Sequence, residues 1–135
     1  MKAWARKLLC IDDDLSLLQA EQLVLESRGY EVVAAASPYE GLELFASQPF
    51  DAVLLDYEMP EMDGGRVAAE MKRTKPGVPI LMHSGQPFAP SGCAHLLDAF
   101  VTKGTPYPVI TGKIEELCSV REPLREAAHR GAAHV

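Results

Sequence analysis

Residues 52–64 read AVLLDYEMPEMDG and contain the clearest fold pattern in the chain. The stretch begins with four apolar residues in a row, which is typical of a parallel strand covered on both faces. The strand is expected to end at Asp56, and Pro60 and Gly64 mark a loop that leads into a helix. The sequence therefore predicts that Asp56 lies at the carboxyl end of a buried strand.

Short apolar runs alternate with longer helix-forming stretches along the rest of the chain. The expected strands are residues 7–11, 31–35, 52–55, 79–83 and 99–102, and the expected helices are residues 15–28, 38–47, 64–75 and 109–121. This alternation predicts an α/β fold of three layers, in which right-handed crossovers place helices on both faces of a parallel five-stranded sheet. The expected architecture is doubly wound (βα)5, flavodoxin-like, with strand order 2-1-3-4-5.

The first helix carries two apolar stripes at helical spacing. Leu17, Ala20 and Val24 form one stripe on one face of the helix. Leu15, Leu18 and Leu25 form the second stripe, and part of it is expected to pack against the last helix.

In a complete (βα)5 pattern a further helix, helix 4, would lie between the fourth and fifth strands. Here this helix is expected to be short or irregular. Pro87 and Pro90 exclude a regular helix after the fourth strand, and only about residues 91–98 remain available for one.

Residues 1–122 are expected to form the single domain, with residues 123–135 as a C-terminal tail or the end of the last helix.

Composition excludes several classes of protein. The chain has 135 residues and a net charge of -6, which argues against a general nucleic-acid binder. It has no apolar stretch near the roughly 20 residues that a membrane-spanning helix needs. Three cysteines without a C-x-x-C pair indicate reduced thiols, so a cytoplasmic protein is predicted.

Polar side chains follow the predicted strands at their carboxyl ends. Asp12 and Asp13 follow the first strand, Asp56 the third, Ser84 the fourth and Lys103 the fifth. Ligands of open parallel sheets bind at this edge, and strands 1 and 3 are neighbours there. Grouped carboxylates repel unless a cation intervenes, and Mg²⁺ suits such oxygen ligands. The pattern predicts a magnesium site at which a carboxylate can accept a phosphoryl group.

Each of these features alone has an ordinary explanation. Aspartate and serine after strands are common helix N-caps, and Asp14 is expected to be one. His83 is expected to be a packed strand residue. The functional interpretation depends on four different strand ends carrying the required groups together.

Residues 54–64, LLDYEMPEMDG, together with the acidic pair, the hydroxyl and the lysine, closely resemble the receiver domain of two-component response regulators. The resemblance covers about residues 7–117 and is to stand-alone, CheY-like receivers. It implies that Asp56 is the phosphoacceptor, modified to 4-aspartylphosphate. It also implies that Asp13, Asp56 and the backbone carbonyl of Glu58 ligate Mg²⁺ directly, with Asp12 acting through water.

The resemblance assigns the remaining residues to the reaction and the switch. Lys103 would pair with Asp56 and then with the phosphoryl group. Ser84 would turn to bond a phosphoryl oxygen. Phe100 occupies the aromatic switch position, although a plain core role for it is equally compatible with the sequence.

The implied function is a signalling switch or phosphorelay intermediate rather than an enzyme with a separate substrate. Its phosphodonor would be a histidine kinase or a histidine phosphotransfer protein, and its output would be a separate protein. A monomer or weak homodimer is expected.

Two alternatives remain open. One is a docking module of the same fold that works without phosphorylation. The other is a small Mg²⁺-dependent phosphatase of the haloacid dehalogenase type, which Asp12-x-Asp14 fits but Asp56 does not support.

Two departures from the family pattern affect the site. Gly104 follows Lys103 where the family usually has a cis-proline, so a trans peptide bond and a reshaped loop are predicted. Glu58 places an acid two residues beyond Asp56, and we hypothesise that it alters the lifetime of the phosphorylated state.

Overall fold

The computed structural model describes the backbone of residues 5–133 and the side chains of residues 5–120. Its elements in chain order are β1 (Lys7–Ile11), α1 (Leu15–Ser27), β2 (Glu31–Ala35), α2 (Pro38–Ser47), β3 (Ala52–Asp56), α3 (Gly64–Thr74), β4 (Ile80–Ser84), the 3-10 turn η1 (Ala94–Leu96), β5 (Ala99–Thr102) and α4 (Tyr107–Ala133). Most predicted boundaries agree to within a residue, which is the usual uncertainty at element ends.

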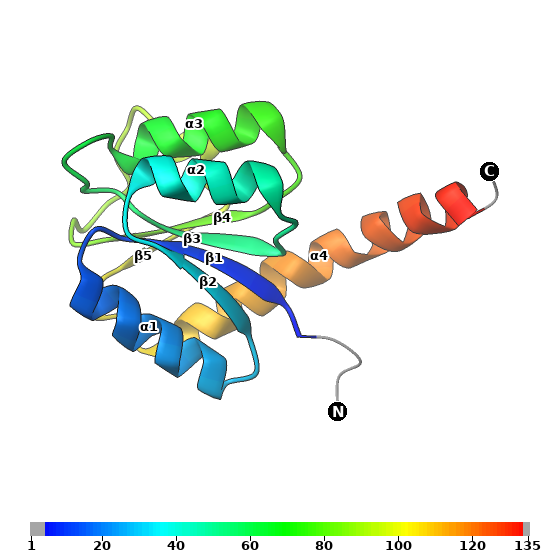
Figure 1. Ribbon diagram of the computed structural model, residues 1–135, viewed down its shortest axis with the longest axis horizontal. Coiled ribbons are helices and arrows are strands. Elements are labelled where there is room, and N and C mark those ends of the chain that lie inside the picture. The colour runs from blue at the N-terminus through cyan, green and yellow to red at the C-terminus, as the bar shows by residue number, and fades with distance from the viewer. Residues whose placement is uncertain (1–4, 134–135) are drawn as a thin grey trace.

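The five strands form one parallel sheet in the order β2-β1-β3-β4-β5. Helices α2 and α3 cover one face of the sheet, and α1 and α4 cover the other (Figure 1). The predicted three-layer, doubly wound fold is confirmed.

Each face of the sheet has its own apolar core. Along β1, Leu9 and Ile11 point to the side of α2 and α3, whereas Leu8 and Cys10 point to the side of α1 and α4. Successive side chains of a strand alternate between faces, so a strand covered on both sides must be apolar throughout. This is the physical reason for the uninterrupted apolar runs in the sequence.

Helix α1 buries the second of its two apolar stripes more deeply than the first. Its buried residues are Leu18, Glu21 and Leu25, whereas Ala20 is exposed. Of the first stripe, Leu17 and Val24 are half-buried. Part of the second stripe packs against α4, as expected. Leu18 and Leu25 lie in the same apolar cluster as Ile110 and Ile114 of α4.

The segment between β4 and β5 contains only the short turn η1, as predicted from its prolines. The carbonyl of Pro90 accepts hydrogen bonds from the backbone N–H groups of Cys93 and Ala94. A loop with one tight turn thus takes the place of a fourth crossover helix.

The last helix is longer than the predicted residues 109–121. Helix α4 begins at Tyr107 because the carbonyl of Pro106 accepts the first helical hydrogen bonds, from Val109 and Ile110. Pro108 is tolerated in this first turn, where its missing N–H is not needed. At the other end, the backbone of α4 continues to Ala133.

Within the described residues, no helix combines the length and apolar character needed to span a bilayer.

The end of β3 and the start of α3 approach each other closely at Gly64. The N–H of Gly64 donates to the carbonyl of Tyr57 at 2.8 Å. A Cβ atom at Gly64 would collide with the backbone oxygen of Asp56 and lie 2.8 Å from the Cα of Tyr57. Only glycine allows this approach without displacing the strand end that carries Asp56.

We expect Gly64→Ala to lower the free energy of unfolding by about 1–3 kcal/mol, because the added methyl overpacks against backbone atoms. Urea unfolding measures this change. Gly112→Ala is the matched control, since Gly112 lies in α4 with open space at the Cβ position and alanine is the better helix former. Equal stabilities of the two variants would contradict the importance of the close approach.

Candidate functional site

Three carboxylates meet at the carboxyl edge of the sheet. Asp12 and Asp13 follow β1, and Asp56 ends β3, the strand that pairs with β1. One oxygen of each carboxylate lies within 4.8 Å of the others. Asp12 and Asp56 are buried, whereas Asp13 is exposed. The sheet thus brings together the acidic residues that the sequence placed at two separate strand ends.

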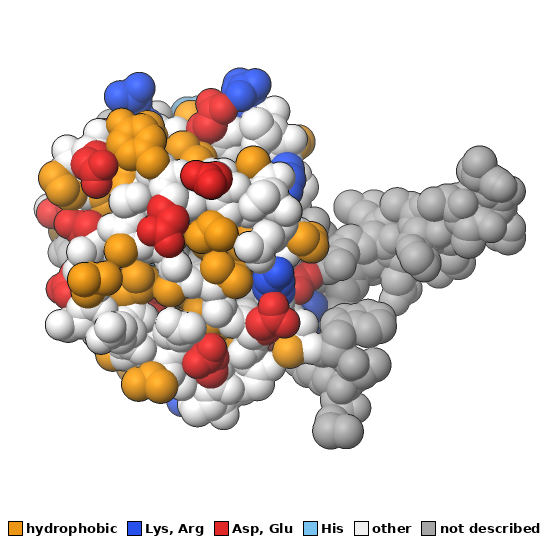
Figure 2. Space-filling view, viewed as in Figure 1, with side chains coloured by type: hydrophobic (Ala, Val, Ile, Leu, Met, Phe, Trp, Pro, Cys, Tyr) orange, Lys and Arg blue, Asp and Glu red, His pale blue; other side chains and the backbone are white. Residues whose placement is uncertain are grey.

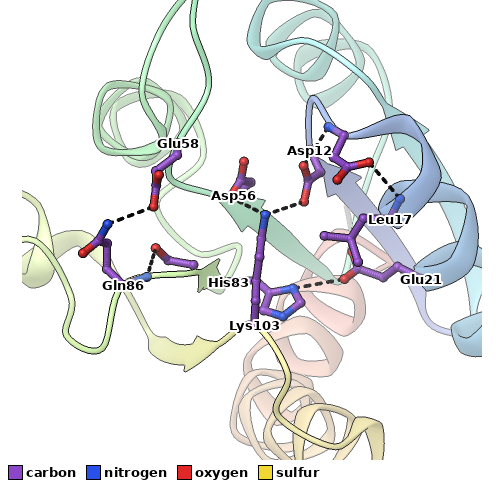
Figure 3. A network of polar contacts seen from close by, with 10 residues as sticks. Asp12, Leu17, Glu21, Asp56, Glu58, His83, Gln86 and Lys103 are labelled. Carbon is purple, nitrogen blue, oxygen red and sulfur yellow. Dashed lines mark hydrogen bonds and ion pairs between the residues drawn. The ribbon is translucent and has the colours of Figure 1, made fainter.

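Lys103 supplies a positive charge to this cluster. Its Nζ lies 3.1 Å from Oδ1 of Asp56 and 3.2 Å from Oδ2 of Asp12, between the two carboxylates (Figure 3). Its backbone N–H donates to the carbonyl of Ser84 at 2.7 Å, which ties the lysine to the end of β4. Burial lowers the pKa of Lys103, but the carboxylates of Asp56 and Asp12 outweigh it and raise the pKa overall.

Asp56 is the most perturbed carboxyl of the cluster. Burial, followed by the charge of Asp12, raises the pKa of Asp56 to about 6, although Lys103 opposes the shift. Among the described residues, Oδ2 of Asp56 has neither a hydrogen bond nor an ion pair, and Oδ1 has only the ion pair with Lys103. A buried oxygen without a partner, beside two further carboxylates, is suited to a cation.

This donor set fits Mg²⁺. The ion takes oxygen ligands, binds one or two protein carboxylates and keeps waters that phosphate oxygens can replace. Asp12, Asp13 and Asp56 offer only carboxylate oxygens, without the nitrogen or sulfur ligands that zinc prefers.

Ser84 and Glu58 are linked through a residue that the sequence analysis missed. Ser84 is fully buried, and its Oγ accepts a hydrogen bond from the backbone N–H of Gln86 at 3.1 Å. The side chain of Gln86 donates from Nε2 to Oε1 of Glu58 at 3.2 Å. The Glu58 carboxylate therefore points towards Gln86 in Figure 3. The available signal was spacing, since Gln86 lies two residues past Ser84 as Glu58 does past Asp56.

The loop after Lys103 has the predicted trans backbone. Every peptide bond in the described chain is trans, and Gly104 adopts a φ of 95°. Proline cannot adopt this conformation because its ring fixes φ near −65°. The N–H of Thr105 donates to the carbonyl of Thr102, which closes the turn.

Phe100 lies in the edge strand β5, opposite Met82 of β4, and is partly exposed. This position is compatible with both roles that the sequence left open for it.

The family model of the response regulator receiver domain matches residues 8–111. The chain belongs to this family.

Curated relatives of this receiver domain are longer proteins. The chain is 33% identical over 128 residues to the transcriptional regulatory protein GlrR of Escherichia coli K12, a match that covers 93% of the chain and 29% of GlrR. The receiver domain therefore spans less than a third of that relative.

Solved receiver structures are similar over most of the chain. The CheY-like receiver domain protein of Methanospirillum hungatei is 27% identical, with a TM-score of 0.81 over 88% of this chain and 98% of that one. The response regulator TrrA of Thermotoga maritima, solved with Mg²⁺ and BeF, is 26% identical, with a TM-score of 0.79 over 83% and 98% of the two chains. TrrA has also been solved in complex with the histidine kinase ThkA.

The raised pKa of Asp56 predicts a pH-dependent stability of the metal-free protein. The folded state holds the Asp56 proton to a higher pH than the unfolded chain does, so stability should fall as the pH rises from about 4 to about 6. Asp56→Asn removes the free-energy cost of ionising this buried carboxyl group. It should raise the free energy of unfolding at about pH 8 by up to about 3 kcal/mol, with a much smaller increase at about pH 4.

Urea unfolding with a chelator at the two pH values measures the difference. Asp14→Asn is the control: Asp14 caps α1 by accepting from the N–H of Leu17, and asparagine caps equally well. A gain for Asp56→Asn that is the same at both pH values would show that the buried charge is not responsible.

Proposed function

We propose that this receiver domain accepts a phosphoryl group on Asp56 in a Mg²⁺-dependent reaction and works as a signalling switch or phosphorelay intermediate. The observation that carries the proposal is the environment of Asp56. Its carboxylate is buried, has one oxygen without a partner among the described residues, and lies between two acids and a lysine.

In this proposal the side chains of Asp13 and Asp56 and the carbonyl of Glu58 would hold Mg²⁺, and Asp12 would assist through water. When bound, the ion neutralises charge on the phosphoryl oxygens, which is the main requirement of phosphoryl transfer. Lys103 lies 3.1 Å from Asp56 and can follow the developing charge from the carboxylate to the phosphoryl group. Oγ of Ser84 accepts from the backbone N–H of Gln86, and the O–H of the same hydroxyl can turn to donate to a phosphoryl oxygen.

The step forms one bond and breaks another. An oxygen of Asp56 attacks the phosphorus of the donor, and the bond from phosphorus to the donor's leaving atom breaks with its electron pair. Hydrolysis by water returns the free carboxylate and inorganic phosphate. Burial of Asp56 limits the access of bulk water to the reacting atoms.

The proposed donor is a phosphohistidine of a histidine kinase or phosphotransfer protein. The similarity to TrrA, which has been solved with a histidine kinase, supports this choice. The output partner is proposed to be another protein or domain rather than nucleic acid bound by this domain. The net charge is -6, and Lys and Arg side chains lie singly on the face shown in Figure 2.

The structure does not favour a phosphatase of the haloacid dehalogenase type. That chemistry would need Asp14 to converge with Asp12 on one substrate. Asp14 is exposed and caps α1, with its Oδ1 accepting from the N–H of Leu17. Asp56 takes the place beside Asp12 instead.

We expect the protein to gain the mass of one phosphoryl group when incubated with Mg²⁺ and acetyl phosphate, as measured by intact mass spectrometry. Asp56→Asn should abolish the gain because it removes the nucleophile, and a chelator should reduce it strongly. Asp14→Asn, the matched control, should keep it. An unmodified wild type would favour the docking module, and sustained release of inorganic phosphate from small phosphomonoesters would favour the phosphatase.

The contact between Gln86 and Glu58 should govern how long the phosphoryl group survives. Because Gln86 holds Glu58, we expect Glu58→Ala and Gln86→Ala to change the dephosphorylation rate constant in the same direction, by roughly two- to tenfold, as for the loss of one hydrogen bond. The double variant should resemble either single variant, since both remove the same interaction.

The rate constant is measured from the loss of the phosphorylated mass after acetyl phosphate is removed. Additive effects of the two substitutions would show that Gln86 does not act through Glu58.

A further inference from the structure

Two buried ionisable side chains lie below the site and take no part in the proposed chemistry. Glu21 of α1 is 3% exposed and His83 of β4 is 5% exposed. Oε2 of Glu21 lies 3.1 Å from Nδ1 of His83 (Figure 3). A carboxylate can only accept a hydrogen bond, so Nδ1 carries the proton in this contact when Glu21 is ionised.

This contact occupies a place where the fold would accept apolar residues. Leu18 and Leu25, which flank Glu21 about one helical turn away in α1, belong to the apolar core. Leu81, which lies on the same face of β4 as His83, belongs to it too. Buried polar pairs are often no more stabilising than apolar residues of similar volume. Moreover, Nε2 of His83 is buried without a partner among the described side chains. Stability alone therefore does not explain the pair.

The pair lies between two parts of the site, the acids after β1 and the hydroxyl at the end of β4. The acids Asp12 and Asp13 come from the end of β1, whereas Ser84 comes from the end of β4. In the sheet, β3 separates these two strands. Glu21 lies in the second turn of the helix that begins just after the acids, and His83 directly precedes Ser84. The contact thus reaches across β3 from one half of the site to the other.

A second contact across the site comes from Lys103, which bridges Asp12 and Asp56. In the proposed reaction this bridge changes, because Lys103 turns towards the phosphoryl group. The contact between Glu21 and His83 does not involve the reacting atoms and can persist through that change. A hydrogen bond fixes direction as well as distance, which apolar packing does not.

We propose that Glu21 and His83 form a positioning pair that holds the acids of β1 and the hydroxyl of β4 at the separation that phosphoryl transfer requires. The inference rests on the proposed function of Asp56. His83 also pairs with Asp56 and Val101 in the registers of β4 with β3 and β5, so its placement affects both neighbouring strand ends.

The test separates positioning from stability with two variants. The double variant Glu21→Leu/His83→Leu replaces the polar contact by apolar packing and avoids an unpaired buried charge. Glu21→Gln keeps an oxygen that can accept from Nδ1. Three quantities are measured for each: the midpoint of urea unfolding, the Mg²⁺ dissociation constant, and the rate constant of phosphorylation by acetyl phosphate at saturating Mg²⁺.

We expect the double variant to keep its unfolding midpoint and, to within about twofold, its Mg²⁺ affinity, since the metal uses acids that do not come from β4. Its phosphorylation rate constant should fall by about tenfold or more, because the transfer needs both halves of the site in register. Glu21→Gln should stay within about threefold of the wild type, because it keeps the hydrogen bond.

Leu25→Ala is the control for general loosening of α1, since it removes apolar packing and leaves the polar contact in place. It should lower the unfolding midpoint with little change in the phosphorylation rate constant. A similar loss of rate in Leu25→Ala, or a double variant that reacts as fast as the wild type, would overturn the inference and leave the proposed function standing. A wild type that gains no phosphoryl group would overturn the proposed function, and this inference with it.

Discussion

Repulsion among three carboxylates at one edge of the sheet is the constraint on which the site depends. Asp12, Asp13 and Asp56 offer oxygens within 4.8 Å of one another, and two of the three are buried. Charges in such a place are unstable without a cation or a proton. Lys103 meets part of this requirement, and a divalent cation can meet the rest. Burial, followed by the charge of Asp12, raises the pKa of Asp56 in the metal-free protein, and Lys103 opposes this shift only in part.

The fold supports this arrangement because strands buried on both faces leave little freedom at their ends. Apolar clusters on the two sides of the sheet hold β1 and β3 in register, and Gly64 lets α3 begin directly against the end of β3. The free energy of burying these cores offsets the repulsion that the acids introduce. Such local strain at a functional site is tolerated when the surrounding structure determines the positions of the residues involved.

The polar contacts around the site lie on two levels. On the solvent side, Gln86 joins Ser84 to Glu58 across the mouth of the site. On the inner side, Glu21 meets His83 across β3. The loop after β4 contains only η1 in place of a regular helix, so the end of β4 has less helical support from its own connection. Contacts from the neighbouring elements thus gain importance for the placement of Ser84.

The amino-acid sequence alone predicted the fold class, the strand order and the residues that gather at the acidic edge. It could do so because parallel topology brings every strand's carboxyl end to one edge, so chemistry at those ends can be read without coordinates. The rotation of α1 was decided only by tertiary structure, because its two apolar stripes are similar and the packing of α4 selects Leu18 and Leu25. The same holds for Glu21 with His83 and for Gln86 with Glu58. These pairs are 62 and 28 residues apart in the chain. Contacts at such distances leave no local pattern in the sequence, and the only signal was that Gln86 and Glu58 each lie two residues past a strand end.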